Sequence, residues 1–159
     1  MRVHPALLEG QRLPPQLLTK GIWKERYQHI RSFERYLARN GFPICKFFLH
    51  VSKKEQKKRF LERIDNAEKN WKFSASDVEE RQRGDVYMEA YQDMIRHTAT
   101  KTAPWYVVPA DNKWFTRLVV AAVTIDLLDS LDLQYPKAGK EKLKELAAAK
   151  ASLLGRIRL

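Results

Sequence analysis

The spacing of apolar and polar residues along the chain predicts helices that alternate with short strands. Apolar residues recur every three or four positions from 22 to 39, which predicts an amphipathic helix ended by Asn40-Gly41. Two mostly apolar runs, at 44–51 and 105–108, are bounded by turn residues and predict buried strands. Because helices and strands alternate with short connections, we expect an α/β fold built on a parallel sheet.

Capping signals predict where the helices after the first strand begin. Ser52 and Glu55 have the spacing of a capping box, so a helix is expected over 53–64. Ser76 and Glu79 repeat that spacing, which predicts a second helix that starts one residue after the serine. The segment between the two predicted helices is a polar connector.

The rest of the chain carries further helical patterns. Gly84 is expected to interrupt or kink its helix, at a cost of roughly 1 kcal/mol against alanine. An apolar stripe over 113–131 predicts a well-buried helix, and a stripe over 140–154 predicts a helix that packs on the domain or on another subunit. Asp111 follows the second predicted strand, a position where a carboxylate could bind magnesium. Because a helix follows, a role as the N-cap of that helix is favoured, for Asp111 or for Asn112.

Composition narrows the classes of partner and site. A chain of 159 residues suits one domain that buries roughly two-thirds of the surface of its unfolded state. The net charge of +11 favours a polyanionic partner. No segment is apolar enough for a signal peptide or a membrane span, and the single cysteine fits a reducing compartment, so the expected location is cytoplasmic. The scattered histidines predict no metal site formed by this chain alone.

A run of cations at helical spacing follows the first predicted strand. Arg59 and Arg63 are four residues apart and share one face of a helix, while Arg81 lies in the first turns of the next one. Lys69 and Lys72 lie in the connector between them. This pattern indicates a mobile anion clamp. The alternative is an exposed, charge-balanced pair of helices, because acidic residues are interleaved with the cations.

The motifs of a complete catalytic centre are absent from the sequence. None of the six glycines belongs to a G-x-x-x-x-G-K-[ST] phosphate-binding loop, and there is no H-E-x-x-H motif or nucleophile elbow. Phosphoryl transfer needs a phosphate cradle, a magnesium site and cations, and only the cations are visible. From its residues, the chain is a basic α/β domain with a candidate anion clamp and no self-sufficient catalytic centre.

Four strings of residues carry a specific resemblance to a known family. They occur in family order from Val3 to about Pro136, and together they resemble the C-terminal part of the polyphosphate kinase 2 family. The strings are IWKERY from Ile22, KFFLHVSKKEQKKRFLERI from Lys46, NWKFSASDVEER from Asn70 and APWYVVPADNKW from Ala103.

The resemblance implies a fold and an activity. The expected fold is the C-terminal portion of a P-loop kinase-like, three-layer α/β fold, with a helical lid at about 53–99 and without the N-terminal P-loop. This portion would occupy 1–136, and 137–159 would form a separate amphipathic helix. The implied reaction is phosphoryl transfer between inorganic polyphosphate and AMP or ADP. The implied catalytic residues are Arg59, Arg63 and Arg81, and the implied polyphosphate-binding residues are Lys69, Lys72 and Arg83.

The sequence also departs from the family pattern. In the family, the P-loop and the acidic magnesium motif precede the region where this chain begins, so Mg²⁺ ligands are expected outside this chain. Gly84 stands where relatives tend to carry a tryptophan, which leaves the packing of the second lid helix open. The expected partners are polyphosphate, AMP or ADP, and either a second copy of the chain or a separate chain carrying the P-loop half. The alternative function is a non-catalytic basic module that binds polyphosphate or nucleic acid, although the interleaved acidic residues disfavour nucleic acid.

Overall fold

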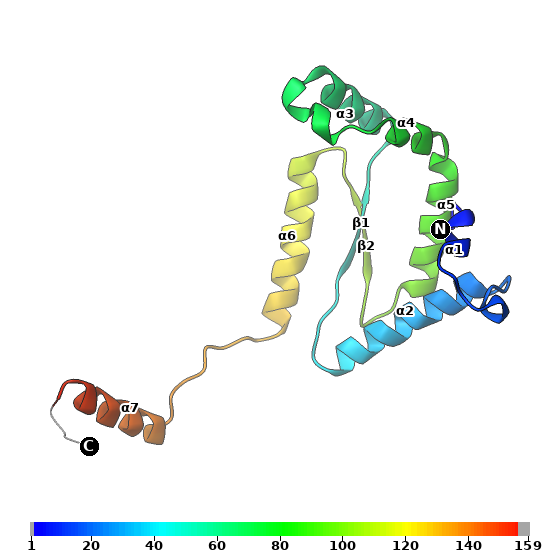
Figure 1. Cartoon of the computed structure of the whole chain (residues 1–159). Coiled ribbons are helices and arrows are strands. Elements are labelled where there is room, and N and C mark those ends of the chain that lie inside the picture. Colours follow the sequence, from blue (N-terminus) through cyan, green and yellow to red (C-terminus); the bar gives the residue numbers. More distant parts are fainter. Residues whose placement is uncertain (1, 156–159) are drawn as a thin grey trace. The chain divides into compact units, whose positions relative to one another are not determined.

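The computed structural model describes residues 2–155, which divide after Ile125 into two compact units. Helices account for most of the chain, and the two strands are short (Figure 1). The elements are α1 (Ala6–Glu9), η1 (Pro15–Leu17), α2 (Ile22–Arg39), β1 (Lys46–His50), α3 (Lys53–Asp65), η2 (Ala67–Lys72), α4 (Ala75–Gln82), α5 (Gly84–Thr98), β2 (Trp105–Pro109), α6 (Lys113–Ser130) and α7 (Lys140–Leu153).

The strands β1 and β2 pair in parallel, as the sequence predicts. Their register runs from Lys46 opposite Trp105 to His50 opposite Pro109. The ladder is bounded by a bond from the Lys46 amide to the Pro104 carbonyl, 3.0 Å, and one from the Ala110 amide to the His50 carbonyl, 2.7 Å. Since parallel strands need a long crossover, the segment from α3 to α5 forms the connection between them (Figure 1).

Several helix boundaries follow from local chemistry. The Ser52 hydroxyl accepts a hydrogen bond from the Glu55 amide at 3.1 Å, which fixes the start of α3 where the capping signal predicts it. Helix α2 ends at Arg39, and Gly41 follows with a φ of +83°, a conformation that glycine adopts without strain. Helix α4 ends at Gln82 and α5 begins at Gly84, so the predicted interruption at this glycine is confirmed.

The predicted start of the second lid helix is wrong. Helix α4 begins at Ala75, so Ser74 rather than Ser76 occupies the N-cap position. The hydroxyls of Ser74 and Ser76 instead hydrogen-bond to each other at 2.7 Å. Either serine can serve as the N-cap of this helix. A start at Ala75 instead of Asp77 makes the short helix two residues longer. The connector before it, which the sequence left without secondary structure, forms the 3₁₀ helix η2.

The predicted burial of the fourth long helix is also wrong. On α6, Trp114 is 69% exposed, and Leu118 and Ile125 are each 58% exposed. Among residues 2–155, few apolar residues are buried, and they are Ile22, Ala103, Val108 and Ala110. A sheet of two strands covers too little area to bury a full apolar stripe, so the large core expected from chain length does not form.

A buried ion pair ties several elements together. The Lys46 ammonium contacts both carboxylate oxygens of Glu34 at 2.7 and 2.8 Å and donates to the Thr98 carbonyl at 2.8 Å. It also lies 5.2 Å from the centre of the Trp105 ring. The Lys46 and Glu34 side chains are only 13% and 11% exposed, so each charge depends on the other for compensation. The pair therefore joins α2, β1, the end of α5 and β2.

Replacing Lys46 by alanine should destabilise the chain, because the Glu34 carboxylate would remain buried without its cation. The expected loss is about 3 kcal/mol in the free energy of unfolding, or complete loss of folding in buffer, measured by urea titration. The exposed Lys57 on α3 provides the matched control, and Lys57→Ala should change stability by no more than about 0.5 kcal/mol. Equal unfolding midpoints for the two variants would contradict a structural role for the pair.

Candidate functional site

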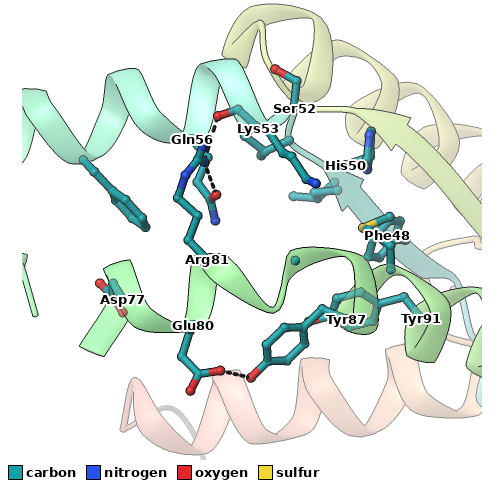
Figure 2. Close-up of a pocket in the computed structure, with 15 residues that line it drawn as sticks. Phe48, His50, Ser52, Lys53, Gln56, Asp77, Glu80, Arg81, Tyr87 and Tyr91 are labelled. Atoms are coloured by element: carbon teal, nitrogen blue, oxygen red, sulfur yellow. Dashed lines mark hydrogen bonds between the residues drawn. The ribbon is translucent and has the colours of Figure 1, made fainter. Parts of the chain in front are cut away.

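A cavity of about 620 Å³ lies at the carboxyl end of β1. The carboxyl ends of strands are where ligands bind in open parallel sheets. The walls come from the end of β1, the first turns of α3, and facing parts of α4 and α5 (Figure 2). The residues that line it are Phe48, Leu49, His50, Val51, Ser52, Lys53, Gln56, Phe60, Asp77, Glu80, Arg81, Gly84, Tyr87, Met88 and Tyr91.

Arg81 is the predicted site residue that lines this cavity. Its Nη1 donates to the Lys53 carbonyl at 2.8 Å and to the Gln56 Oε1 at 2.6 Å, as Figure 2 shows. These bonds hold α4 against the first turn of α3 and position the guanidinium at the cavity wall. Within residues 2–155, both hydrogen bonds of Arg81 use Nη1, so Nε and Nη2 keep donors for a ligand.

A second cation lies across the cavity from α4. The Lys53 ammonium pairs with the Asp85 carboxylate at 2.6 Å, and both side chains are largely exposed. A Cβ atom added at Gly84 would lie 3.6 Å from the Cε of Lys53, which is ordinary contact distance. A bulky side chain at this position would therefore compete with the lysine for space. The glycine leaves the stem of Lys53 room at the cavity wall.

The outer end of the cavity carries a hydrogen-bonded acidic group. The Tyr87 hydroxyl donates to the Glu80 Oε2 at 2.7 Å, and the His4 Nε2 lies 2.8 Å from the same oxygen. The hydrogen bond from Tyr87, and then that from His4, hold the pKa of Glu80 below its ordinary value. The bond to the carboxylate also raises the pKa of Tyr87. Arg83, a predicted polyphosphate-binding residue, contacts the His4 Nδ1 at 3.5 Å, so it belongs to this network.

Arg59 on α3 forms hydrogen bonds to the loop that follows β2, and together with Asp111 it makes a brace between the loops after β1 and β2. Its Nη2 donates to the carbonyls of Ala110 and Asp111 at 2.8 and 3.0 Å, and its Nε donates to the Glu55 carboxylate at 2.9 Å. The side chain is 23% exposed. Arg59 therefore joins α3 to the loop after β2, a structural role that the sequence pattern does not indicate.

Asp111 completes that brace. Its Oδ1 accepts a hydrogen bond from the Ser52 amide at 2.7 Å, and this bond is the main reason that the pKa of Asp111 lies below its ordinary value. Asn112 occupies the cap position of α6, and its carbonyl accepts the Thr116 amide at 3.1 Å. Of the two capping candidates, Asn112 therefore starts the helix, while the carboxylate of Asp111 joins the loop after β2 to the loop after β1.

Three more of the predicted cations lie on α3 and η2, away from the cavity lining. The Arg63 guanidinium lies 5.8 Å from the centre of the Phe60 ring, and the Lys72 ammonium lies 4.9 Å from that of Trp71. Lys69 forms an ion pair with Glu62. None of these three cations lines the cavity, and neither do Arg59 and Arg83. The structure therefore brings Arg81 to the cavity and distributes the other five predicted residues around it.

Several polar residues that line the cavity were not among the predicted site residues, including Asp77 and Glu80 on α4. His50 ends β1, Ser52 and Lys53 begin α3, and Gln56 lies one turn later. The position of these residues directly after a parallel strand was the available signal, because such positions meet at the ligand-binding edge of a sheet.

Among residues 2–155, no three His, Cys, Asp or Glu side chains are grouped so that they could hold a metal ion. No helix in the same part is long and apolar enough to cross a membrane.

Comparisons with known proteins identify the family. The family model for polyphosphate kinase 2 matches residues 16–138. The ADP-polyphosphate phosphotransferase of Rhodopseudomonas palustris is 47% identical over 97% of this chain. The crystal structure of polyphosphate kinase 2 from Arthrobacter aurescens TC1 is similar over 89% of the chain, with a TM-score of 0.77 and 38% identity. The chain belongs to the polyphosphate kinase 2 family.

The extent of these matches differs between relatives. The chain spans about half the length of the relatives named above, 54% of the Rhodopseudomonas protein and 48% of the Arthrobacter structure. A relative from Leptolyngbya boryana, called "Uncharacterized protein in chlN 3'region", is 53% identical over 83% of this chain and 97% of its own length. A region of this size is therefore shared both with longer phosphotransferases and with a protein of similar extent.

Asp111 should make stability depend on pH in the acidic range. Its folded-state pKa lies below 3.8, so its stabilising contribution is fully present above that value and is lost as the pH falls through the folded-state pKa. Urea unfolding of the wild type and of Asp111→Asn, measured from pH 7 to pH 2, should show a difference that disappears at the acidic end. The exposed Asp129 on α6 is the control, and Asp129→Asn should show no such convergence. A pH-independent difference for Asp111→Asn would contradict the assigned hydrogen bond.

Proposed function

We propose that this chain acts as the lid and C-terminal core of a polyphosphate-dependent nucleotide kinase, transferring a phosphoryl group between inorganic polyphosphate and AMP or ADP. The observation that carries the proposal is the position of Arg81 at a cavity beyond the carboxyl end of β1. Membership of the polyphosphate kinase 2 family and the names of the similar phosphotransferases support it. The net charge of +11 would attract the polyanionic substrate.

The proposal gives separate roles to the predicted cations. Arg81 would stabilise the charge of the phosphoryl group in transfer, because it lines the cavity, its two hydrogen bonds use only Nη1, and a guanidinium matches phosphate geometry. Arg59 and Arg63 would act with it when the lid contacts substrate. Lys69, Lys72 and Arg83, which lie outside the cavity, would hold more distant parts of the polymer. Lys53 is added to the set as a second cation at the cavity wall.

Magnesium would be bound by residues outside this chain. Magnesium prefers carboxylate and water ligands, and no three His, Cys, Asp or Glu side chains are grouped as a metal site among residues 2–155. The phosphate cradle would likewise come from the part of the domain that the longer relatives carry in addition. We therefore propose that the chain alone is inactive and becomes active when that part is supplied.

A chimera tests this proposal. The N-terminal part of the Rhodopseudomonas phosphotransferase, as far as the start of the matched region, would be joined to the full chain. With ADP, long-chain polyphosphate and magnesium, the chimera should form ATP and the chain alone should not. A folded chimera without turnover would contradict the proposed kinase function. Turnover by the chain alone would contradict the proposed need for further residues.

Arg81→Ala in the active chimera should lower turnover by about 10²-fold, the scale for removing one group that stabilises transition-state charge. The loss should fall on kcat more than on KM, because the interaction is strongest in the transition state. Arg35, an exposed arginine on α2, gives the matched control, and Arg35→Ala should keep near-normal turnover. Near-normal turnover of Arg81→Ala would remove this residue from the mechanism.

The alternative is a non-catalytic module that binds polyphosphate or nucleic acid, and the net charge of +11 favours it. Its affinity would fall linearly with salt on a logarithmic plot, and the chimera would show binding without turnover. The chimera assay therefore separates the two functions.

A further inference from the structure

Helix α4, which carries Arg81, is not held in place by burial. None of its eight residues is buried, and its largest apolar residue, Val78, is 44% exposed. Most helices in proteins are stabilised by packing of an apolar face, so the position of α4 depends on polar ties instead. Two neighbouring residues supply these ties. Figure 2 shows that they point in different directions, Arg81 toward Gln56 and Glu80 toward Tyr87.

The tie through Glu80 continues into the N-terminal segment. The His4 Nε2 lies 2.8 Å from the Glu80 Oε2 and 3.2 Å from the Tyr87 hydroxyl. On the other side of the same ring, the Arg83 Nη1 lies 3.5 Å from the His4 Nδ1. A guanidinium only donates, so Nδ1 is the accepting nitrogen, and Nε2 carries the proton that is donated to Glu80. A neutral imidazole in this one tautomer therefore satisfies both neighbours.

Two residues before His4, Arg2 anchors the same segment. Its guanidinium donates to the Tyr27 hydroxyl on α2 and forms an ion pair with Asp93 on α5. The hydrogen bond from Arg2 is the main reason that the pKa of Asp93 lies below its ordinary value. Because Pro5 follows, His4 is restricted to extended backbone geometry, which limits the freedom of the segment between its two contacts.

We propose that residues 2–4 form a strap that holds α4 in place and thereby positions Arg81 at the cavity, with His4 as the residue that fastens the strap to Glu80. The strap joins α4 to α2, which lies outside the predicted lid. His4 is thus a positioning residue, because it would act on the phosphoryl group only through Arg81. That effect on turnover rests on the proposed function, whereas the strap itself rests on the contacts of this chain.

Amide hydrogen exchange of the chain alone, followed by NMR, tests the strap without reference to catalysis. In His4→Ala, the Glu80 and Arg81 amides should exchange about tenfold faster than in the wild type, the scale for losing one hydrogen bond to a charged group. The Phe48 amide reports on β1 and should exchange as before. Unchanged exchange in α4, or an equal acceleration at Phe48, would overturn the proposal.

Two further variants separate the bond from the loss of a side chain. His4→Gln should restore slow exchange in α4, because its Nε2 can donate to Glu80 as the imidazole does. His29, an exposed histidine on α2, gives the matched control, and His29→Ala should leave the exchange of α4 unchanged. Equal acceleration by His29→Ala and His4→Ala would count against the strap.

The tautomer of His4 gives a readout that needs no substitution. Nitrogen NMR of the unaltered chain, at a pH where the ring is neutral, should show the proton on Nε2. A proton on Nδ1 would contradict the donation to Glu80 and would overturn the proposal even if no variant folds.

A double-mutant cycle in the chimera tests the link to Arg81. His4→Ala should lower turnover about tenfold when Arg81 is present and should have little effect in the Arg81→Ala background, because the two residues act as one unit. His4→Gln should keep most of the turnover. Equal losses in both backgrounds would show that His4 does not act through Arg81.

The outcomes distinguish this inference from the proposed function. Faster exchange of α4 in His4→Ala, together with a folded chimera that forms no ATP, would support the strap and refute the kinase function. ATP formation by the chimera with unchanged exchange of α4 in His4→Ala would do the reverse.

Discussion

The brace between the loops that follow β1 and β2 is the constraint on which the candidate site depends. Asp111 accepts the Ser52 amide, and Arg59 donates to the carbonyls of Ala110 and Asp111. Two strands provide few ladder hydrogen bonds, so a sheet of this size gains its fixed geometry from such side-chain ties. Because α3 starts at the braced loop, the position of the Arg81 guanidinium against its first turn follows from the same ties.

The sequence predicts local structure well where one interaction decides it. The bounds of α2, the start of α3 at the Ser52 cap and the break before Gly84 all depend on residues within a few positions of each other. The start of α4 was missed, because Ser74 and Ser76 both suit a cap and the choice between them depends on helix length. When two neighbouring residues suit the N-cap equally well, the surrounding structure decides where the helix starts.

Properties that depend on distant parts of the chain were harder to predict. The apolar stripe of α6 indicates burial, yet the stripe contains no information about whether a covering layer is present. Spacing places Arg59 and Arg63 on one helical face, but only the fold shows that Arg59 contacts the loop after β2, more than fifty residues away. The sequence shows that Arg81 is a cation near the start of a helix. It does not show the cavity beside Arg81, because that cavity forms only where α4 contacts α3.

The buried Lys46 ammonium has a consequence for how the chain opens. It binds groups from α2 and the end of α5 and lies against a β2 aromatic ring, so these elements should unfold together as one cooperative unit. The segment from η2 to α4 includes exposed pairs such as that of Lys69 with Glu62, and its ties to distant residues run through Arg81 and Glu80. Such a segment opens at lower free energy than the unit around Lys46. The cations on this segment can therefore change position while the sheet and its ion pair stay folded.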